Sequence, residues 1–241
     1  LVVLSILGLY GFHRGHLLFL YWKHRKDVPK PPARFVELPR VTVQLPMYNE
    51  MYVAERLLEG VAAIDYPKDK LEIQVLDDST DETVDIARKK AEELAARGFD
   101  VVYRHRENRH GYKAGALEEG LREAKGDYVL VFDADFVPTP SIVNDLIHWF
   151  TNPKVGMVQA RWGHLNRDYS VLTRVQSMML DGHFVIEHIA RNRSGRFFNF
   201  NGTAGIWRRS TIIDAGGWQH DTLTEDMDLS FRAQLRGWEF I

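Results

Sequence analysis

The sequence predicts an α/β fold with a mostly parallel central sheet and helices on both of its faces. Strand and helix signals alternate from residue 41 to about residue 135, a pattern typical of a parallel sheet covered by helices. The segment Tyr128–Phe132 is apolar without a break, as in strands buried on both faces of such a sheet. Asp133 and Asp135 follow it directly, at the sheet edge where open α/β sheets bind ligands.

The elements of the first half follow a regular order. Strands are expected at 41–46, 71–79, 100–106 and 127–135, and helices after Asn49, after Ser79 and over 112–126. Ser79 and Glu82 have the spacing of a capping box for the second of these helices.

The second half has a looser pattern. A strand is expected over 154–162, a long helix over 171–192, and an aromatic-rich loop or short strand over 197–209. A last helix over 224–237 begins at Thr224 and ends at Gly237. We expect this half to add a layer to the same sheet and not to form a separate domain.

The composition excludes several classes of function. The chain of 241 residues is 45% hydrophobic and 27% charged, which suits a globular fold with a real core. A net charge of -2 gives no indication of a nucleic-acid partner. The absence of cysteine excludes disulfides, thiolate metal sites and a cysteine nucleophile.

The N-terminal segment, residues 1–25, is expected to cross or lie on a membrane. Residues 1–22 have the length of a span, and the basic residues 23–26 that follow favour a cytoplasmic flank. The alternative is a helix buried against its own domain. We expect the chain to be a piece of a longer protein whose first helix is cut. Residues 26–40 hold four of the nine prolines and are expected to be an extended linker.

The two acidic strand ends predict a polar cleft. Two carboxylates at Asp133 and Asp135 would need a compensating cation, and hard oxygen ligands favour magnesium or manganese. The alternative is a solvated turn. Asp77 and Asp78 end another apolar strand, where a carboxylate would face a base or a ribose, although a helix-capping turn fits them as well.

A basic loop and an acidic helix start complete the candidate site. Lys113 lies near a helix N-terminus, where an anion such as phosphate is favoured, and the loop matches neither the Walker nor the G-x-G-x-x-G pattern. Asp226 lies in the first turn of its helix and would be an ionised base. Simple helix capping by Glu225 and Asp226 is the alternative.

Eight segments together resemble the membrane-embedded family 2 glycosyltransferases, in the cellulose synthase-like branch that includes plant glucomannan mannosyltransferases and bacterial relatives. The resemblance runs from about Arg40 to Ile241 and rests on these segments: QLPMYNE, QVLDDSTDET, NRHGYKAGAL, FDADF, VQARW, FNGTAGIWRR, AGGW and EDMDL.

This resemblance implies a GT-A type nucleotide-diphospho-sugar transferase fold, with residues 41–150 as the nucleotide-sugar-binding half and 151–241 as the acceptor-side half. It implies an inverting transfer of a hexose from UDP-glucose or GDP-mannose to a growing β-linked polysaccharide, at a membrane of the plasma or Golgi type and on its cytoplasmic side. Its implied site residues are Asp226 as general base; Asp78, Lys113 and Asp133 for the donor; Asp135 with Asp133 for Mg or Mn; and Phe200, Asn201, Gly202, Thr203 and Glu225 for the glycan acceptor.

Three alternatives stay open at this point. One is a single transfer to a lipid, as in ceramide glucosyltransferases, and a second is nucleotide-sugar binding without turnover. The third, a nucleotide-dependent oxidoreductase, has little support. The Gln-x-x-Arg-Trp motif of processive relatives is not present, so the sequence does not predict processivity. The side chains of Phe197, Phe198 and Phe200 are expected to pack in the core and not to stack on a sugar. His183 and His188 are expected to be structural.

Overall fold

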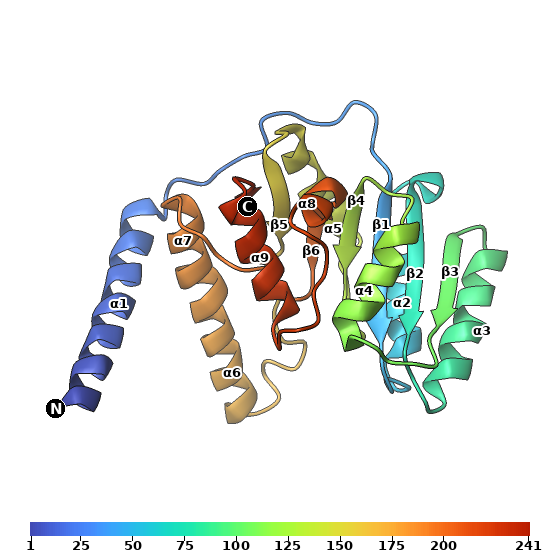
Figure 1. Cartoon of the computed structure of the whole chain (residues 1–241), viewed down its shortest axis with the longest axis horizontal. Helices are drawn as coiled ribbons and strands as arrows, with labels where there is room; N and C mark the ends of the chain where they lie inside the picture. Colours follow the sequence, from blue (N-terminus) through green and yellow to red (C-terminus); the bar gives the residue numbers. More distant parts are fainter. The chain divides into compact units, whose positions relative to one another are not determined.

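The computed structural model describes all 241 residues and divides into two compact units (Figure 1). Unit 1 comprises residues 1–30 and 161–198, and unit 2 comprises residues 31–160 and 199–241. We expected residues 161–198 to add a layer to the sheet. They do not, and they belong to the same compact unit as the N-terminal helix. The linker also differs from the expectation, because its second half packs on unit 2, where Tyr66 Oη donates a hydrogen bond to Pro39 O.

Unit 2 is built on one seven-stranded sheet in the order β3-β2-β1-β4-β6-β5-β7. The pairs among β1 to β4 and the pair β5–β7 are parallel, whereas β6 runs antiparallel to both β4 and β5. The sheet is therefore mostly parallel, as predicted. The strands are β1 (Val41–Met47), β2 (Leu71–Asp77), β3 (Asp100–His105), β4 (Tyr128–Val131), β5 (Val155–Gln159), β6 (Gly205–Arg208) and β7 (Glu239–Phe240).

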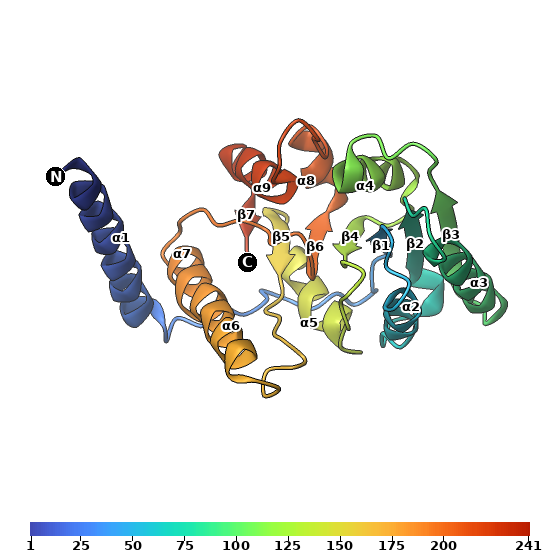
Figure 2. The ribbon, with the colours of Figure 1, turned by 90° about the horizontal axis from the view of Figure 1, so that it is seen from below.

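Helices cover both faces of this sheet. Figure 2 shows the strands between α4, α8 and α9 on one side and α2, α3 and α5 on the other. Their bounds are α2 (Ala54–Ala62), α3 (Thr83–Ala96), α4 (Tyr112–Glu123), α5 (Ile142–Ile147), α8 (Arg209–Asp214) and α9 (Glu225–Leu235), with 3₁₀ turns at Lys68–Lys70 and His148–Thr151.

The central strands are buried because both of their faces are covered. All seven residues of β2 and all four of β4 are buried, which confirms the prediction made from the apolar run at 128–132. The face toward α4 also carries polar side chains, among them Gln44 and Gln74, whose amides share a hydrogen bond of 3.0 Å. A Cβ at Gly120 of α4 would lie 2.6 Å from Gln44 Nε2, so glycine lets the helix approach this pair without moving its side chains.

Of the two expected helix starts, the one at Ser79 is wrong and the one at Thr224 is confirmed. Helix α3 begins at Thr83, and the Ser79 hydroxyl accepts a hydrogen bond from Asn49 N instead of capping the helix. Thr224 is the N-cap residue of α9, but its side chain makes no capping hydrogen bond. In the first case the loop after β1 competes for the hydroxyl group, and local spacing does not reveal that competitor.

Unit 1 consists of α1 (Val2–His24), α6 (Val171–Asp181), a π-helical stretch (Gly182–His188) and α7 (Ile189–Arg193). The last three form one continuous helix, as predicted for 171–192, and the π stretch is its only irregular part. Helix α1 packs on α7 through Leu17, Leu20 and Ala190, and Arg14 pairs with Glu187 at 2.8 Å. His188 is buried among aromatic rings, and burial lowers its pKa to about 3, so it is neutral.

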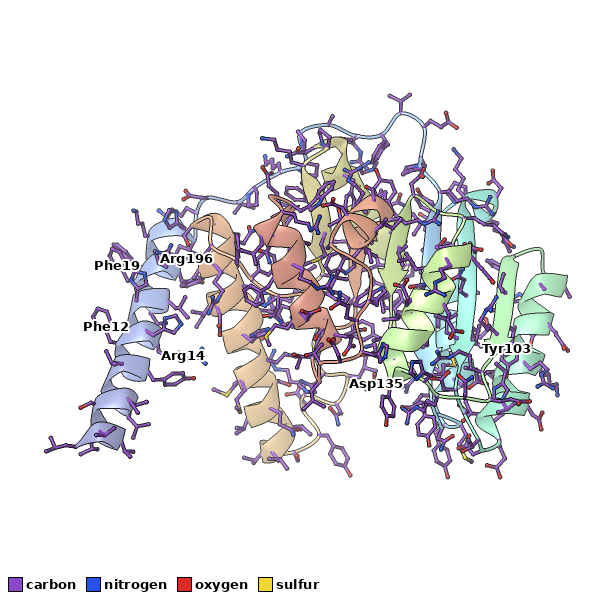
Figure 3. The ribbon with its side chains drawn as sticks, in the orientation of Figure 1. Phe12, Arg14, Phe19, Tyr103, Asp135 and Arg196 are labelled. Carbon is purple, nitrogen blue, oxygen red and sulfur yellow. The ribbon has the colours of Figure 1, made fainter.

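Most of α1 is exposed, in contrast to the alternative of a helix buried in its own domain. Figure 3 shows Phe12 and Phe19 on one side of α1 and Arg14 on the other. Helix α1 is the one helix that is long and apolar enough to cross a membrane.

Candidate active site

A pocket of about 400 Å³ lies at the carboxyl ends of β1, β2 and β4. In Figure 3 the labelled Asp135 lies at this edge of unit 2. Every residue that lines the pocket comes from the range 46–135: Pro46, Met47, Tyr48, Glu50, Asp78, Arg109, Lys113, Ala116, Asp133, Ala134 and Asp135. The three acidic positions that the sequence assigned to a donor and its metal, namely 78, 133 and 135, therefore meet in one pocket.

The two carboxylates after β4 are not placed as expected. Strand β4 ends at Val131, and a turn closed by the hydrogen bond from Phe136 N to Asp133 O (3.1 Å) carries both side chains. Asp133 is half-buried and Asp135 is exposed, and the strand expected over 127–135 ends before both of them. The Lys113 ammonium pairs with Asp133, so the protein itself supplies one compensating cation.

Lys113 is held in place by the backbone of the loop before α4. Gly111 and Tyr112 both have left-handed conformations, with φ of 70° and 50°. A Cβ at Gly115 would lie 2.1 Å from His110 O, so the loop can fold back on the helix only because residue 115 is glycine. The glycines of this segment therefore shape a lysine-presenting loop, and they form no phosphate-binding P-loop.

The acidic end of β2 is saturated by protein partners. Both oxygens of Asp78 accept hydrogen bonds from Arg106, at 2.7 and 2.6 Å, and both side chains are buried. Asp77 accepts from Tyr103 Oη (2.6 Å) and from Ser79 N (2.9 Å), so it is a structural residue. Arg106, which the sequence reasoning missed, also donates to His110 O and Tyr112 O and so holds the Lys113 loop.

A fourth carboxylate of the pocket, Glu50, was also missed. Burial raises the pKa of Glu50, and the charges of Asp135 and Asp133 raise it further. Three carboxyl groups of like charge therefore lie near one another in the pocket. A bound cation would reduce the repulsion between them. Glu50 is the last residue of the segment QLPMYNE. This segment indicated the end of a strand, but it gave no reason to assign a role to Glu50.

The acceptor-side loop 200–204 lies beside the pocket because of the antiparallel pairing of β4 with β6. Val131 at the end of β4 is opposite Gly205 at the start of β6, so the residues that leave one strand meet those that enter the other. Asp133 N donates to Thr203 Oγ1 (3.0 Å), and Lys113 Nζ donates to Gly202 O (3.0 Å).

Asp226 and Glu225, in the first turn of α9, border the same space. Burial raises the pKa of both carboxyl groups. A Cβ at Gly202, whose φ is 75°, would lie 3.3 Å from Asp226 Oδ2 and 3.4 Å from Lys113 Nζ. Only glycine leaves this space open between the carboxylate, the ammonium group and the loop.

Loop 200–204 depends on two further residues that the sequence did not indicate. Gln159 accepts from Asn201 N (3.0 Å) and donates to Thr203 O (3.0 Å). Ser230 Oγ accepts from Phe200 N (2.9 Å) and donates to Asp226 O (2.5 Å). The Phe200 ring is fully buried against Trp207, so Phe200 cannot offer its side chain to an acceptor as the resemblance implied.

Backbone strain gathers at this edge of the sheet. The three residues other than glycine with positive φ are Asn49, Tyr112 and Ala204, at 56°, 50° and 53°. Asn49 is next to Glu50 in the chain, Tyr112 is next to Lys113, and Ala204 is next to Thr203. Such conformations persist where the surrounding structure fixes them, and they cluster at functional sites.

Residues 39–241 match the sequence profile described as Glycosyltransferase like family 2. The chain belongs to this family. Two curated relatives from Arabidopsis thaliana are glucomannan 4-beta-mannosyltransferase 9, 41% identical over all of this chain, and glucomannan 4-beta-mannosyltransferase 2, 47% identical over 93% of it. The alignments cover 45% and 44% of those proteins, so this glycosyltransferase chain spans less than half of their length.

Solved structures confirm the GT-A type fold. Mannosyltransferase PcManGT from Pyrobaculum calidifontis, in complex with GDP-Man and Mn²⁺, has a TM-score of 0.74 and 28% identity, over 98% of this chain and 64% of that chain. TarS from S. aureus in complex with UDP-GlcNAc has a TM-score of 0.61 and 18% identity, over 83% of this chain and 55% of its own, and supports the fold alone. The predicted family and fold are therefore confirmed.

Proposed function

We propose that this chain is the catalytic part of an enzyme that transfers mannose from GDP-mannose, with inversion, to a β-linked glycan. The observation that carries the proposal is the position of Asp226 Oδ2 at the space next to Gly202 and Lys113, beside a pocket lined by Asp78, Asp133 and Asp135. The names of the Arabidopsis relatives and the GDP-Man bound to PcManGT favour mannose over the glucose that the sequence left open.

The pocket fits a nucleoside diphosphate with a divalent cation. Magnesium and manganese take hard oxygen ligands, and they are usually held by one or two carboxylates together with substrate phosphates. Asp135, with Asp133, would hold the ion, and Glu50 lines the same pocket, where burial first and then the charges of Asp135 and Asp133 raise its pKa. No three acidic or imidazole groups form a complete metal cage. When bound, the cation supplies positive charge that stabilises the leaving diphosphate.

Asp226 is the base in this proposal. It accepts the proton of the acceptor hydroxyl while that oxygen forms a bond to the anomeric carbon and the bond from this carbon to the phosphate oxygen breaks. Met227 N donates to Asp226 Oδ1 (2.8 Å), which leaves Oδ2 toward the open space at Gly202. Glu225, Asn201 and Thr203 border the acceptor side, with the loop held by Gln159.

We further propose that α1 attaches the enzyme to a membrane, with the catalytic unit on the cytoplasmic side. The helix is apolar and largely exposed, and Lys23, Arg25 and Lys26 stand at its C-terminal end. Basic residues that flank a span are retained on the cytoplasmic side.

Calorimetric titration of the purified protein with GDP-mannose and UDP-glucose, with and without Mn²⁺, tests this function. We expect GDP-mannose to bind only with Mn²⁺, and Asp135→Ala to weaken that binding by about 10-fold or more, since it removes a ligand of the ion. Asp85→Ala, on the exposed side of α3, is the matched control and should bind like the wild type. Folded protein that binds neither donor would refute the proposed function.

A further inference from the structure

The arginine at the mouth of the pocket, Arg109, is positioned by aromatic rings instead of by a counter-ion. Its guanidinium carbon lies 3.3 Å from the centroid of the Tyr48 ring and 5.2 Å from that of Tyr112. No carboxylate pairs with it, and its side chain makes no hydrogen bond within the protein. Stacking on an aromatic face holds a guanidinium flat without using its N–H groups. Arg109 therefore presents a planar set of unused donors at the pocket.

The other cations around the pocket are engaged, which sets Arg109 apart. Lys113 pairs with Asp133 and with Gly202 O, and Arg106 is buried with Asp78 and Glu119. Arg109 alone among these three has its whole hydrogen-bonding capacity left for a ligand. Arg109 contacts Tyr48, which follows β1, and both line the pocket together with Asp78, whereas Asp226 is not among the lining residues.

We propose that Arg109 selects guanine over uracil in the nucleotide donor. This inference rests on the proposed function, because it names a residue that reads the base of the donor. Guanine offers two adjacent acceptors, O6 and N7, that match the two-pronged donor face of arginine, as in the recognition of guanine in DNA. Uracil has no such pair, because the N3–H donor lies between its two carbonyl groups. The stacked position of Arg109 lowers the entropy cost of holding this geometry.

The test compares GDP, UDP and 7-deaza-GDP, which lacks the N7 acceptor, by titration in the presence of Mn²⁺. We expect the wild type to prefer GDP to UDP, and to bind 7-deaza-GDP several-fold more weakly than GDP. In Arg109→Ala the Kd for GDP should rise by about 10-fold or more, whereas the Kd for UDP should change little. GDP and 7-deaza-GDP should then bind equally, because the contact to N7 is gone.

Two further variants separate base recognition from charge. Arg109→Lys keeps the positive charge but not the planar fork, so we expect it to lose the preference for GDP as well. Arg88→Ala removes another arginine that stacks on a tyrosine, Tyr103, outside the pocket, and should leave all three affinities unchanged.

Several outcomes would overturn the inference. Equal weakening of GDP and UDP in Arg109→Ala, or full recovery in Arg109→Lys, would show that Arg109 only attracts phosphate. A wild type that binds UDP more tightly than GDP would overturn it while leaving a nucleotide-sugar enzyme in place. A folded wild type that binds none of the three nucleotides would refute the proposed function itself, and the inference with it.

Discussion

The acidic ends of β2 and β4 have the same sequence pattern but opposite roles in the structure. Both follow an apolar strand, yet Asp78 is buried and paired at both oxygens with Arg106, whereas Asp133 is half-buried and Asp135 is exposed. The β2 end uses its charge to fix, through Arg106, the segment that leads into α4 and Lys113. The β4 end leaves its carboxylate oxygens facing the pocket. The comparison teaches that two carboxylates after a strand indicate a polar edge, and that the partners around them decide whether the edge is structural or free to bind.

The largest expected effect is on catalysis, at Asp226 beside the β4 end of the sheet. Asp226→Asn should lower the rate of sugar transfer by about 10²–10⁴-fold, because an amide cannot take the proton of the acceptor hydroxyl. Binding of GDP-mannose should change little, and single-turnover kinetics with calorimetry measure the two quantities separately. Asp228→Asn, two residues further along α9 where Asp228 pairs with Arg232, is the matched control. Equal loss of binding and transfer in Asp226→Asn would remove the role of base from this residue.

The second prediction concerns stability and contrasts the two strand ends directly. Asp78→Asn should lower the free energy of unfolding by about 3 kcal/mol or more, because it leaves the buried Arg106 without its main counter-ion. Asp133→Asn should change it by less than about 1 kcal/mol, because its pair with Lys113 is partly exposed to solvent. Urea unfolding of both variants at pH 7 measures the difference. Similar losses in both would mean that the two ends are not distinct in the way the structure indicates.

The third prediction is the pH dependence of transfer. Burial raises the pKa of Asp226, and the base must be ionised to accept a proton. We therefore expect kcat/KM to fall as pH decreases through a pKa above the usual aspartate value of about 4. A profile that stays flat down to pH 4 would contradict a buried base. The corresponding profile for donor binding alone should lack this step.

The smallest expected effect links that same pKa to stability. A carboxyl group whose pKa is raised in the folded state destabilises the protein at pH values above its unfolded pKa, since the folded state holds the ionised carboxylate less favourably than the unfolded state does. Asp226→Asn should therefore raise the midpoint of thermal unfolding slightly at pH 7. The gain should shrink as the pH falls through the raised pKa of the folded state, and it should vanish well below about 4, where the folded and unfolded states are both protonated. Calorimetric scans at a series of pH values measure it, and a lower midpoint at pH 7 would show that Asp226 stabilises the fold.

The sequence by itself determined the mostly parallel sheet, the family and the chemical character of the site. The sheet and the acidic character of the site follow from local patterns: apolar runs long enough to be strands, helical periodicity between them, and acidic residues at the ends of the expected strands 71–79 and 127–135. The family follows from the resemblance of the eight segments quoted above. The sequence did not predict which groups form hydrogen bonds with the hydroxyl and carboxylate side chains. Ser79 was given to a helix cap that the structure does not form, because Asn49 from a distant loop donates to it.

Only the tertiary structure decided which polar residues act together. The antiparallel pairing of β4 with β6 places Gly202 and Thr203 beside Asp133, although 70 residues separate Asp133 from Thr203 in the chain. Glu50, Gln159 and Arg106 gave no distinctive signal, since their importance comes from contacts with distant residues and not from their own spacing. Arg109 is the clearest case: a surface arginine in the sequence, it becomes a candidate reader of the base because Tyr48, at the end of another strand, holds it flat.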